Sequence, residues 1–260
     1  MKRRDKAAKA MEFPIKIESI GGRKVSNTNL WVDAGDSHVG RFRKRPVVAT
    51  FIGKDSTVSD PNIVKSIISK LSSKGVLVPE LIAYSSGPEM PVYVFEKLGR
   101  KSISGKGIKQ NNLYGFLLRQ LKLGSVDSAY LRQLRKYVSS AARSIGTMHK
   151  LGIEHGHLHL GNVIPVGSRI GIIDFKLAVE KNVNWGNVSG VIEAFLKDYL
   201  ALTQNWRRLF GHGSQEDLRQ FDFLRRLFFR KLVAKYPMSD ENKQLLFANL
   251  MHWSRPNLLS

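Results

Sequence analysis

The chain has 260 residues, of which 42% are hydrophobic; this is enough apolar material for a core, so disorder is not the expected state. No apolar run approaches the ~18 residues of a transmembrane helix, and the basic residues 1–10 contain no apolar leader segment. The chain has no cysteine, which excludes disulfides and thiolate metal sites. We therefore expect a soluble, cytoplasmic protein with no transmembrane segment.

Basic residues dominate the charge balance. There are 42 Lys and Arg against 21 Asp and Glu, which gives a formal net charge of +21. Such a field attracts polyanions, so the sequence suggests a nucleic acid or ribonucleoprotein partner on a basic surface. The alternative is that the charge serves solubility alone, and composition leaves both interpretations open.

The first hundred residues are predicted to be rich in β-strands. After a basic tail at residues 1–12, β-branched and aromatic runs separated by polar turns predict strands at residues 15–20, 30–32, 46–52, 76–83 and 92–96. A helix is predicted to begin at Asp60-Pro61 and to end before Gly75. Its apolar residues recur at helical spacing: Ile63, Ile67, Ile68 and Leu71.

Helices dominate the rest of the chain. Residues 101–112 are polar and contain glycine, which is typical of a linker. A helix at residues 113–123 and a longer one that ends before Gly152 come next, the longer one with a buried stripe of Leu131, Leu134, Val138, Ala142, Ile145 and Met148. Short strands at 163–166 and 169–174 precede further helices. This order predicts an α+β fold with two lobes: an antiparallel β-rich N-lobe at residues 13–100 and a helical C-lobe at residues 101–260.

Two side chains near the short strands carry metal-binding oxygens. Asn162 ends a polar loop that follows the long predicted helix, and Asp174 ends the second short strand. Phosphoryl transfer needs groups that hold Mg²⁺ against phosphates, and Mg²⁺ prefers hard oxygen ligands such as these. The spacing therefore predicts that Asn162 and Asp174 bind a magnesium ion.

Several runs resemble one superfamily in the same order along the chain. Residues 153–164 resemble the H-G-D-x-H-x-G-N catalytic loop of aminoglycoside-phosphotransferase-like kinases and of the small atypical kinase that serves tRNA threonylcarbamoylation, and residues 173–175 resemble their Ile-Asp-Phe metal motif. Residues 75–84 are similar to the stretch after their regulatory helix, and residues 92–99 to their hinge. Residues 19–27 are similar to their glycine-containing phosphate loop.

The resemblance implies a protein-kinase-like, two-lobed fold that binds ATP and Mg²⁺ between its lobes. It places Gly21 and Gly22 in the phosphate loop, and Glu96, Lys97 and Leu98 at the adenine-binding hinge. It also implies that the catalytic residues are His157, Asn162 and Asp174, of which Asn162 and Asp174 hold the metal.

The chain departs from the family pattern at three points. His157 stands where the family has its catalytic aspartate; histidine, with an unperturbed pKa of roughly 6.5, can serve as a general base or merely fill space. The phosphate-anchoring lysine is missing from the predicted strand, where Lys44 and Lys54 flank the position as substitutes. The following helix has no glutamate to pair with such a lysine.

These departures leave two functions open. The first is an atypical ATP-dependent phosphotransferase that acts on a protein or other macromolecular substrate. The second is a catalytically degenerate pseudokinase that serves as a nucleotide-binding or nucleic-acid-associated scaffold. Fold alone does not decide between them.

Two further patterns have rival interpretations. His155, His157 and His159 alternate and suggest a metal site, although the family loop assigns structural roles to His155 and His159. The aromatic and basic run at residues 221–229 could stack on bases, or could be a buried amphipathic helix with a solvated basic face.

Overall fold

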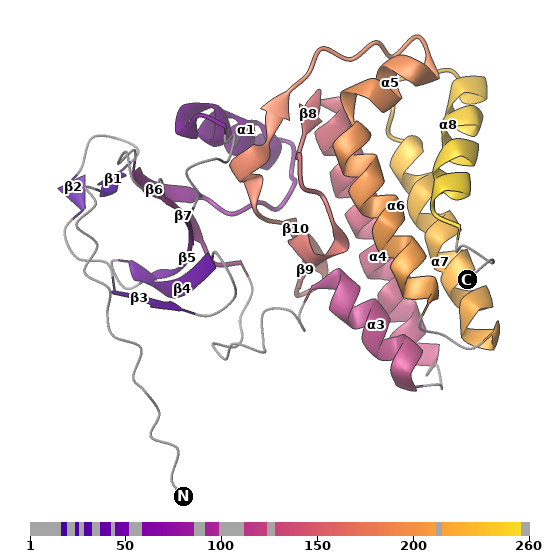
Figure 1. The fold of residues 1–260 in the computed structure, drawn as a ribbon, viewed down its shortest axis with the longest axis horizontal. Helices are drawn as coiled ribbons and strands as arrows, with labels where there is room; N and C mark the ends of the chain where they lie inside the picture. The colour runs from indigo at the N-terminus through magenta and orange to yellow at the C-terminus, as the bar shows by residue number, and fades with distance from the viewer. Residues whose placement is uncertain are drawn as a thin grey trace, which may run out of the picture.

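The computed structural model describes residues 17–19, 24–25, 29–32, 37–42, 45–51, 59–85, 92–98, 112–123, 128–211 and 215–255, and the statements below concern these residues. An antiparallel sheet with one helix beside it forms the N-terminal part, and a helical part follows it (Figure 1). Within this described part, no helix is both long enough and apolar enough to cross a bilayer.

The N-terminal sheet has seven antiparallel strands in the order β2-β1-β6-β7-β5-β4-β3. Its strands β3, β4 and β5 form a meander, and β7 lies between β5 and β6. The strand bounds are β1 Ile17–Ser19, β2 Lys24–Val25, β3 Asn29–Val32, β4 Ser37–Phe42, β5 Arg45–Phe51, β6 Leu81–Ser85 and β7 Val92–Glu96. The β4 strand was not predicted, because its polar and glycine-containing sequence, SHVGRF, lacks an alternating apolar pattern.

The predicted strand at residues 76–83 is wrong in its first half, since β6 begins only at Leu81. The preceding residues pair with the C-terminal part of the chain instead. Leu77 forms a parallel bridge with Gly171, and the Ile172 N–H donates to the Leu77 carbonyl at 2.9 Å. A second backbone bond, from Ser59 N–H to the Lys176 carbonyl at 3.0 Å, ties the same two regions together.

Helix α1, Pro61–Ser73, forms as predicted. Asp60 caps it by accepting a hydrogen bond from the Asn62 N–H at 2.7 Å, and proline occupies the first turn, where its missing N–H costs nothing. The buried face differs from the prediction at one position. Ile63 is 48% exposed, and Val64 packs into the core in its place.

The C-terminal part packs its helices around α4, the long helix predicted from the apolar stripe. Its helices are α3 Leu113–Leu123, α4 Ser128–Lys150, α5 Val188–Ala194, α6 Leu196–Phe210, α7 Gln215–Val233 and α8 Asp240–Trp253. All predicted stripe residues of α4 are buried except Leu131, which is partly buried. Two small antiparallel pairs lie against this bundle: β8 Ile153–Glu154 with β11 Val179–Glu180, and β9 Val163–Val166 with β10 Arg169–Ile172.

Three of the four aromatic residues of α7 belong to the core, and the fourth, Phe223, is 46% exposed. Phe221, Phe228 and Phe229 are at most 2% exposed, so they are not available to stack on bases. Arg225, on the same helix, is also buried, and it pairs with Asp222. The buried amphipathic interpretation of this run is therefore confirmed for Phe221, Phe228 and Phe229, whereas Phe223 is exposed and Arg225 does not belong to the solvated basic face.

Helix α4 comes close to the C-terminal end of α7 at Gly146. A Cβ atom at this position would lie 2.9 Å from the Leu232 carbonyl oxygen and 2.8 Å from the Lys235 Cβ. Only glycine leaves room for this contact.

We expect Gly146→Ala to lower the free energy of unfolding by about 1–2 kcal/mol, because overpacking outweighs the usual preference of helices for alanine. Gly211→Ala is the control, since a Cβ there would meet only the Arg208 carbonyl, at 3.5 Å. Urea denaturation of both variants measures the difference. A more stable Gly146→Ala variant would contradict the packing described here.

Candidate active site

The loop at residues 155–162 and the β9–β10 hairpin lie side by side in the C-terminal part. The Ile173 N–H donates to the Asn162 carbonyl at 3.0 Å, which joins the end of the loop to the residue before Asp174. The loop ends in a short 3-10 turn at Leu160–Asn162, and a second such turn follows Asp174 at Phe175–Leu177. The local fold thereby brings two of the predicted site residues, Asn162 and Asp174, into one region.

The side chain of Asn162 is held by its own loop. Its Nδ2 donates to the His157 carbonyl at 2.9 Å, and the residue is 7% exposed. This bond fixes the orientation of the amide. The side-chain oxygen is therefore the acceptor that remains for a ligand.

Asp174 has the backbone conformation that most residues avoid. Its φ of 70° and ψ of 52° are left-handed, and it is the only non-glycine residue with positive φ among those described. Such a conformation costs on the order of 1–2 kcal/mol and is often found at functional sites. Its buried Oδ1 accepts no hydrogen bond. A strained carboxylate with an orphan oxygen is the strongest sign of a ligand site in this chain.

Two basic side chains flank the Asp174 carboxylate. Lys176 Nζ lies 3.5 Å from Oδ1, and His157 Nδ1 lies 3.6 Å from Oδ2. Burial acts to raise the pKa of Asp174, but the contact with His157 and the charge of Lys176 outweigh it, so this pKa is lowered. The three predicted catalytic residues, His157, Asn162 and Asp174, therefore lie together, with His157 half exposed to solvent.

His155 is structural, as the family loop implied. Its buried ring donates from Nε2 to the Ile173 carbonyl at 2.8 Å and accepts the His157 N–H at Nδ1. Burial lowers its pKa, which keeps the ring neutral and preserves this pair of bonds. No group of three His, Cys, Asp or Glu side chains within the described ranges is arranged to hold a metal, so the alternating histidines form no such site there.

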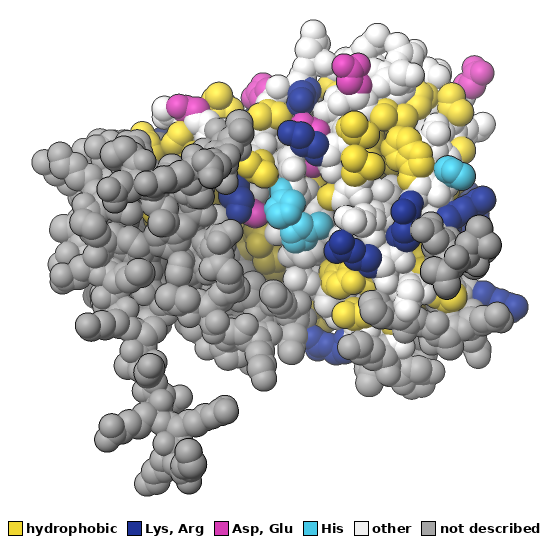
Figure 2. Space-filling view, viewed as in Figure 1, with side chains coloured by type: hydrophobic (Ala, Val, Ile, Leu, Met, Phe, Trp, Pro, Cys, Tyr) yellow, Lys and Arg dark blue, Asp and Glu magenta, His cyan; other side chains and the backbone are white. Residues whose placement is uncertain are grey.

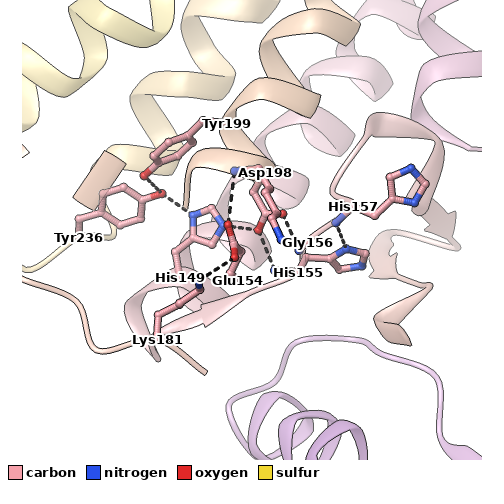
Figure 3. Close-up of polar contacts among 10 residues, drawn as sticks. His149, Glu154, His155, Gly156, His157, Lys181, Asp198, Tyr199 and Tyr236 are labelled. Carbon is pink, nitrogen blue, oxygen red and sulfur yellow. Dashed lines mark hydrogen bonds and ion pairs between the residues drawn. The ribbon is translucent and has the colours of Figure 1, made fainter. Parts of the chain in front are cut away.

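Asp198 of α6 anchors the loop, a role that was not predicted from the sequence. Asp198 is fully buried; its Oδ2 accepts the His155 N–H at 2.8 Å, and its Oδ1 accepts the Gly156 N–H at 2.9 Å. His149 Nε2 lies 3.1 Å from Oδ2, and Figure 3 shows these groups converging on the one carboxylate. An acid between the apolar residues Phe195 and Tyr199 is the sequence signal that could have revealed it.

Aromatic hydroxyls continue the network behind His149. The Tyr236 hydroxyl lies 2.7 Å from His149 Nδ1, and the Tyr199 hydroxyl donates to Tyr236 at 3.0 Å (Figure 3). Burial raises the pKa of both tyrosines, so each keeps its proton as a donor. The network joins α4, α6 and the segment after α7 to the loop.

The predicted hinge residues lie at the end of β7, where the sheet meets the C-terminal hairpin. Glu96 N–H donates to the Glu80 carbonyl at 2.8 Å, and Lys97 N–H donates to the Pro46 carbonyl at 3.0 Å. These two donors are thus used within the sheet. The Leu98 side chain packs on Gly171 of β10, where a Cβ would lie 2.8 Å from its Cδ1.

The other residues that were predicted to contact the nucleotide are not among those that the structure describes. Gly21, Gly22, Lys44 and Lys54 lie outside the described residues, so their predicted roles stay predictions. The lysine and glutamate that pair in the family are absent from the two elements that would carry them: β5 contains no lysine, and α1 contains no acidic residue.

The residues present fit a magnesium ion in part. The orphan Oδ1 of Asp174 and the free acceptor of the Asn162 amide are two oxygen donors of the kind that Mg²⁺ prefers. A magnesium ion is usually completed by phosphate oxygens and water, so two protein ligands are sufficient.

A pocket of about 760 Å³ lies on the other side of the loop, between the loop, α3 and α6. His157, His159 and Gly161 form its wall on the loop side. His157 therefore contacts Asp174 at the hairpin and also faces this pocket.

Two solved structures are similar to the chain at low identity. A structure described as WaaP in complex with acyl carrier protein is 16% identical, with a TM-score of 0.48 over 86% of this chain and 87% of that one. The pseudokinase domain of BIR2, an immune regulator of the RLK/Pelle family, is 13% identical, with a TM-score of 0.47 over 92% of this chain and 82% of that one. No protein-family profile and no curated protein matches the sequence.

The arrangement of elements defines the class of fold. A small antiparallel sheet carries α1 between β5 and β6, and a helical part with the loop and hairpin follows. This is a two-lobed, protein-kinase-like α+β fold, as the sequence predicted. The predicted lobe boundary at residues 100 and 101 lies outside the described residues and stays a prediction.

We expect Asp198→Asn to lower the free energy of unfolding by about 3 kcal/mol, because an amide N–H₂ would face the buried N–H donors of the loop. Asp240→Asn is the matched control, since Asp240 is exposed on α8. Urea denaturation compares the two variants. Equal unfolding midpoints would show that Asp198 does not anchor the loop.

Proposed function

We propose that the chain is an ATP-dependent phosphotransferase of the kinase-like superfamily, with His157, Asn162 and Asp174 as its catalytic residues. The observation that carries the proposal is Asp174, a strained carboxylate whose buried Oδ1 accepts no hydrogen bond, beside the half-exposed ring of His157. The kinase-like fold alone would not support an activity, because folds of this class also serve as binding modules.

Asn162 and Asp174 are proposed to hold Mg²⁺, which when bound would neutralise charge on the transferred phosphate. ATP is proposed to lie between the lobes, with Glu96, Lys97 and Leu98 at the adenine. The Glu96 and Lys97 N–H groups are engaged in the sheet. Any backbone contact of adenine at the hinge would therefore use groups other than these two N–H donors.

His157 is the proposed general base. Its Nδ1 faces the Asp174 carboxylate, so an Nδ1–H tautomer leaves the Nε2 lone pair available to the acceptor. The 3.6 Å separation is longer than a hydrogen bond, and such contacts commonly shorten when substrate binds. Asp174 would then both bind the metal and orient the base.

The proposed step conserves atoms and charge. The acceptor hydroxyl oxygen bonds to the γ-phosphorus while the bond from that phosphorus to the bridging oxygen of the β-phosphate breaks. ADP leaves with that electron pair, and the hydroxyl proton passes to His157 Nε2. The acceptor predicted from the sequence is a protein or other macromolecule, and this prediction remains open.

Two observations favour the second function, a pseudokinase. The Lys176 ammonium lies 3.5 Å from the orphan oxygen of Asp174, in the region a metal ion would occupy. The absence of a lysine in β5 and of an acid in α1 points the same way. A scaffold of this kind would bind nucleotide without magnesium. A nucleic acid partner remains a proposal from net charge, since three of the four α7 aromatics are buried.

Transfer of labelled phosphate from ATP separates the two functions. We expect His157→Ala to lower the rate about a hundredfold, within the range that a general base contributes, and His157→Asp to retain or raise activity. Asp174→Asn should abolish the magnesium-dependent part of the thermal stabilisation by ATP, because it removes the charged metal ligand.

Ser69→Ala, an exposed change on α1, is the control for both measurements. Transfer that is unaffected by His157→Ala would defeat the proposed base. Stabilisation by ATP that is equal with and without magnesium would favour the pseudokinase.

A further inference from the structure

The pocket beside His157 lies between the loop, α3 and α6, and the contacts of Asp198 and Asn205 hold the loop to α6. Asn205 of α6 accepts the Leu160 N–H at 2.8 Å, which fixes the second half of the loop to the same helix that carries Asp198. Asn112, which precedes α3, accepts the Gly115 N–H at 2.8 Å. The pocket is therefore held by buried and half-buried hydrogen bonds to the backbone.

These bonds also determine what the pocket offers to a ligand. Because the side-chain oxygens of Asn205 and Asn112 accept backbone N–H groups, each amide has its N–H₂ group left. Asn112 Nδ2 lies 3.7 Å from the position of a Cβ on Gly161, so it reaches the loop side of the pocket. Both residues line the pocket, and Asn205 is only 8% exposed. The fixed polar groups are therefore hydrogen-bond donors.

The charge of the lining is positive. Arg119 of α3 and Arg208 of α6 line the pocket, and none of its described lining residues is Asp or Glu. In Figure 2, histidine side chains near the middle of the face have Lys and Arg side chains around them. Arginine is well suited to a planar or tetrahedral oxyanion, which it can bind through two N–H groups.

His159 lies beside His157 within the same wall, with ring centroids 4.6 Å apart. Burial lowers the pKa of His159 to about 4, so its ring is neutral at physiological pH. Its Nδ1 would lie 2.6 Å from a Cβ at position 161, and the glycine there lets the ring pack against the loop. A neutral imidazole can donate to or accept from a hydroxyl group.

We propose that this pocket is the acceptor site and that, in place of the macromolecular acceptor predicted from the sequence, it takes a small hydroxyl compound carrying an oxyanion, a phosphate monoester or a carboxylate. Arg208 and Arg119 bind the oxyanion, the amides of Asn205 and Asn112 donate to it or to neighbouring hydroxyls, and the reacting hydroxyl lies at His157. A volume of about 760 Å³ is within the range of small-molecule sites. The role as acceptor rests on the proposed phosphotransferase function; the oxyanion binding does not.

Three matched probes test the pocket without nucleotide or metal: glucose 6-phosphate, glucuronate and glucose. Titration of the ¹⁵N-labelled chain by NMR follows the side-chain amides of Asn112 and Asn205. We expect both anionic sugars to shift these signals saturably at millimolar concentration, and glucose to shift them at least tenfold more weakly. The preferred anion identifies which oxyanion the pocket takes.

Arg208→Gln should weaken binding of the preferred anion about tenfold, the loss expected for one charge-assisted contact. Lys197→Gln is the matched control, because it removes one charge from an exposed position on the same helix, outside the pocket. It should leave binding within twofold. His159→Gln, which keeps a polar side chain, provides a second variant on the loop wall and should also weaken binding.

The inference is overturned if the anionic sugars bind no better than glucose, or if Lys197→Gln weakens binding as much as Arg208→Gln. The latter would mean a general electrostatic attraction to the basic chain. Anion binding together with no phosphate transfer would remove the phosphotransferase function but leave the oxyanion site. Phosphate transfer without anion binding would remove this inference alone.

Discussion

One buried carboxylate organises the functional half of this protein. Asp198 accepts N–H groups from His155 and Gly156 and contacts His149, so the end of α4, the loop and the distant helix α6 meet at two oxygens. A buried charge is costly unless it is fully hydrogen-bonded, so the network tolerates little rearrangement. The loop is thereby held in one conformation. His157 and Asn162 are positioned because the backbone beneath them cannot move freely.

The hairpin that carries Asp174 depends on this loop and on the N-terminal part alike. His155 donates to the Ile173 carbonyl, and the residues after α1 pair with β10. Asp174 therefore lies where contacts from both parts of the chain meet. Its left-handed backbone is tolerated because the neighbours on each side are fixed. A movement of either part can therefore alter the position of the Asp174 carboxylate. Lys176 and His157 compete with any metal ion for its oxygens.

Local sequence signals predicted the elements that depend on local physics. The apolar spacing was sufficient to predict helices α1 and α4, and the motif was sufficient to predict that the loop and Asp174 lie together. Both signals are encoded over a few residues. The pairing of Leu77 with Gly171 and the hydrogen-bond partners of Asp198 were not predicted, since both depend on contacts between residues distant in sequence. The exposure of Ile63 has the same origin: a helix has several apolar residues, and its packing partner decides which of them face the core.

The central claim is that Asp174 and Asn162 together hold the metal of a bound nucleotide. Mn²⁺ in place of Mg²⁺ tests it directly, because this paramagnetic ion broadens NMR signals of nearby groups. With ATP present, the account predicts strong broadening of the Asn162 side-chain amide and of the His157 ring, and loss of that broadening in Asp174→Asn. Sharp Asn162 signals with Mn²⁺ and ATP bound, or equal broadening in Asp174→Asn, would contradict it.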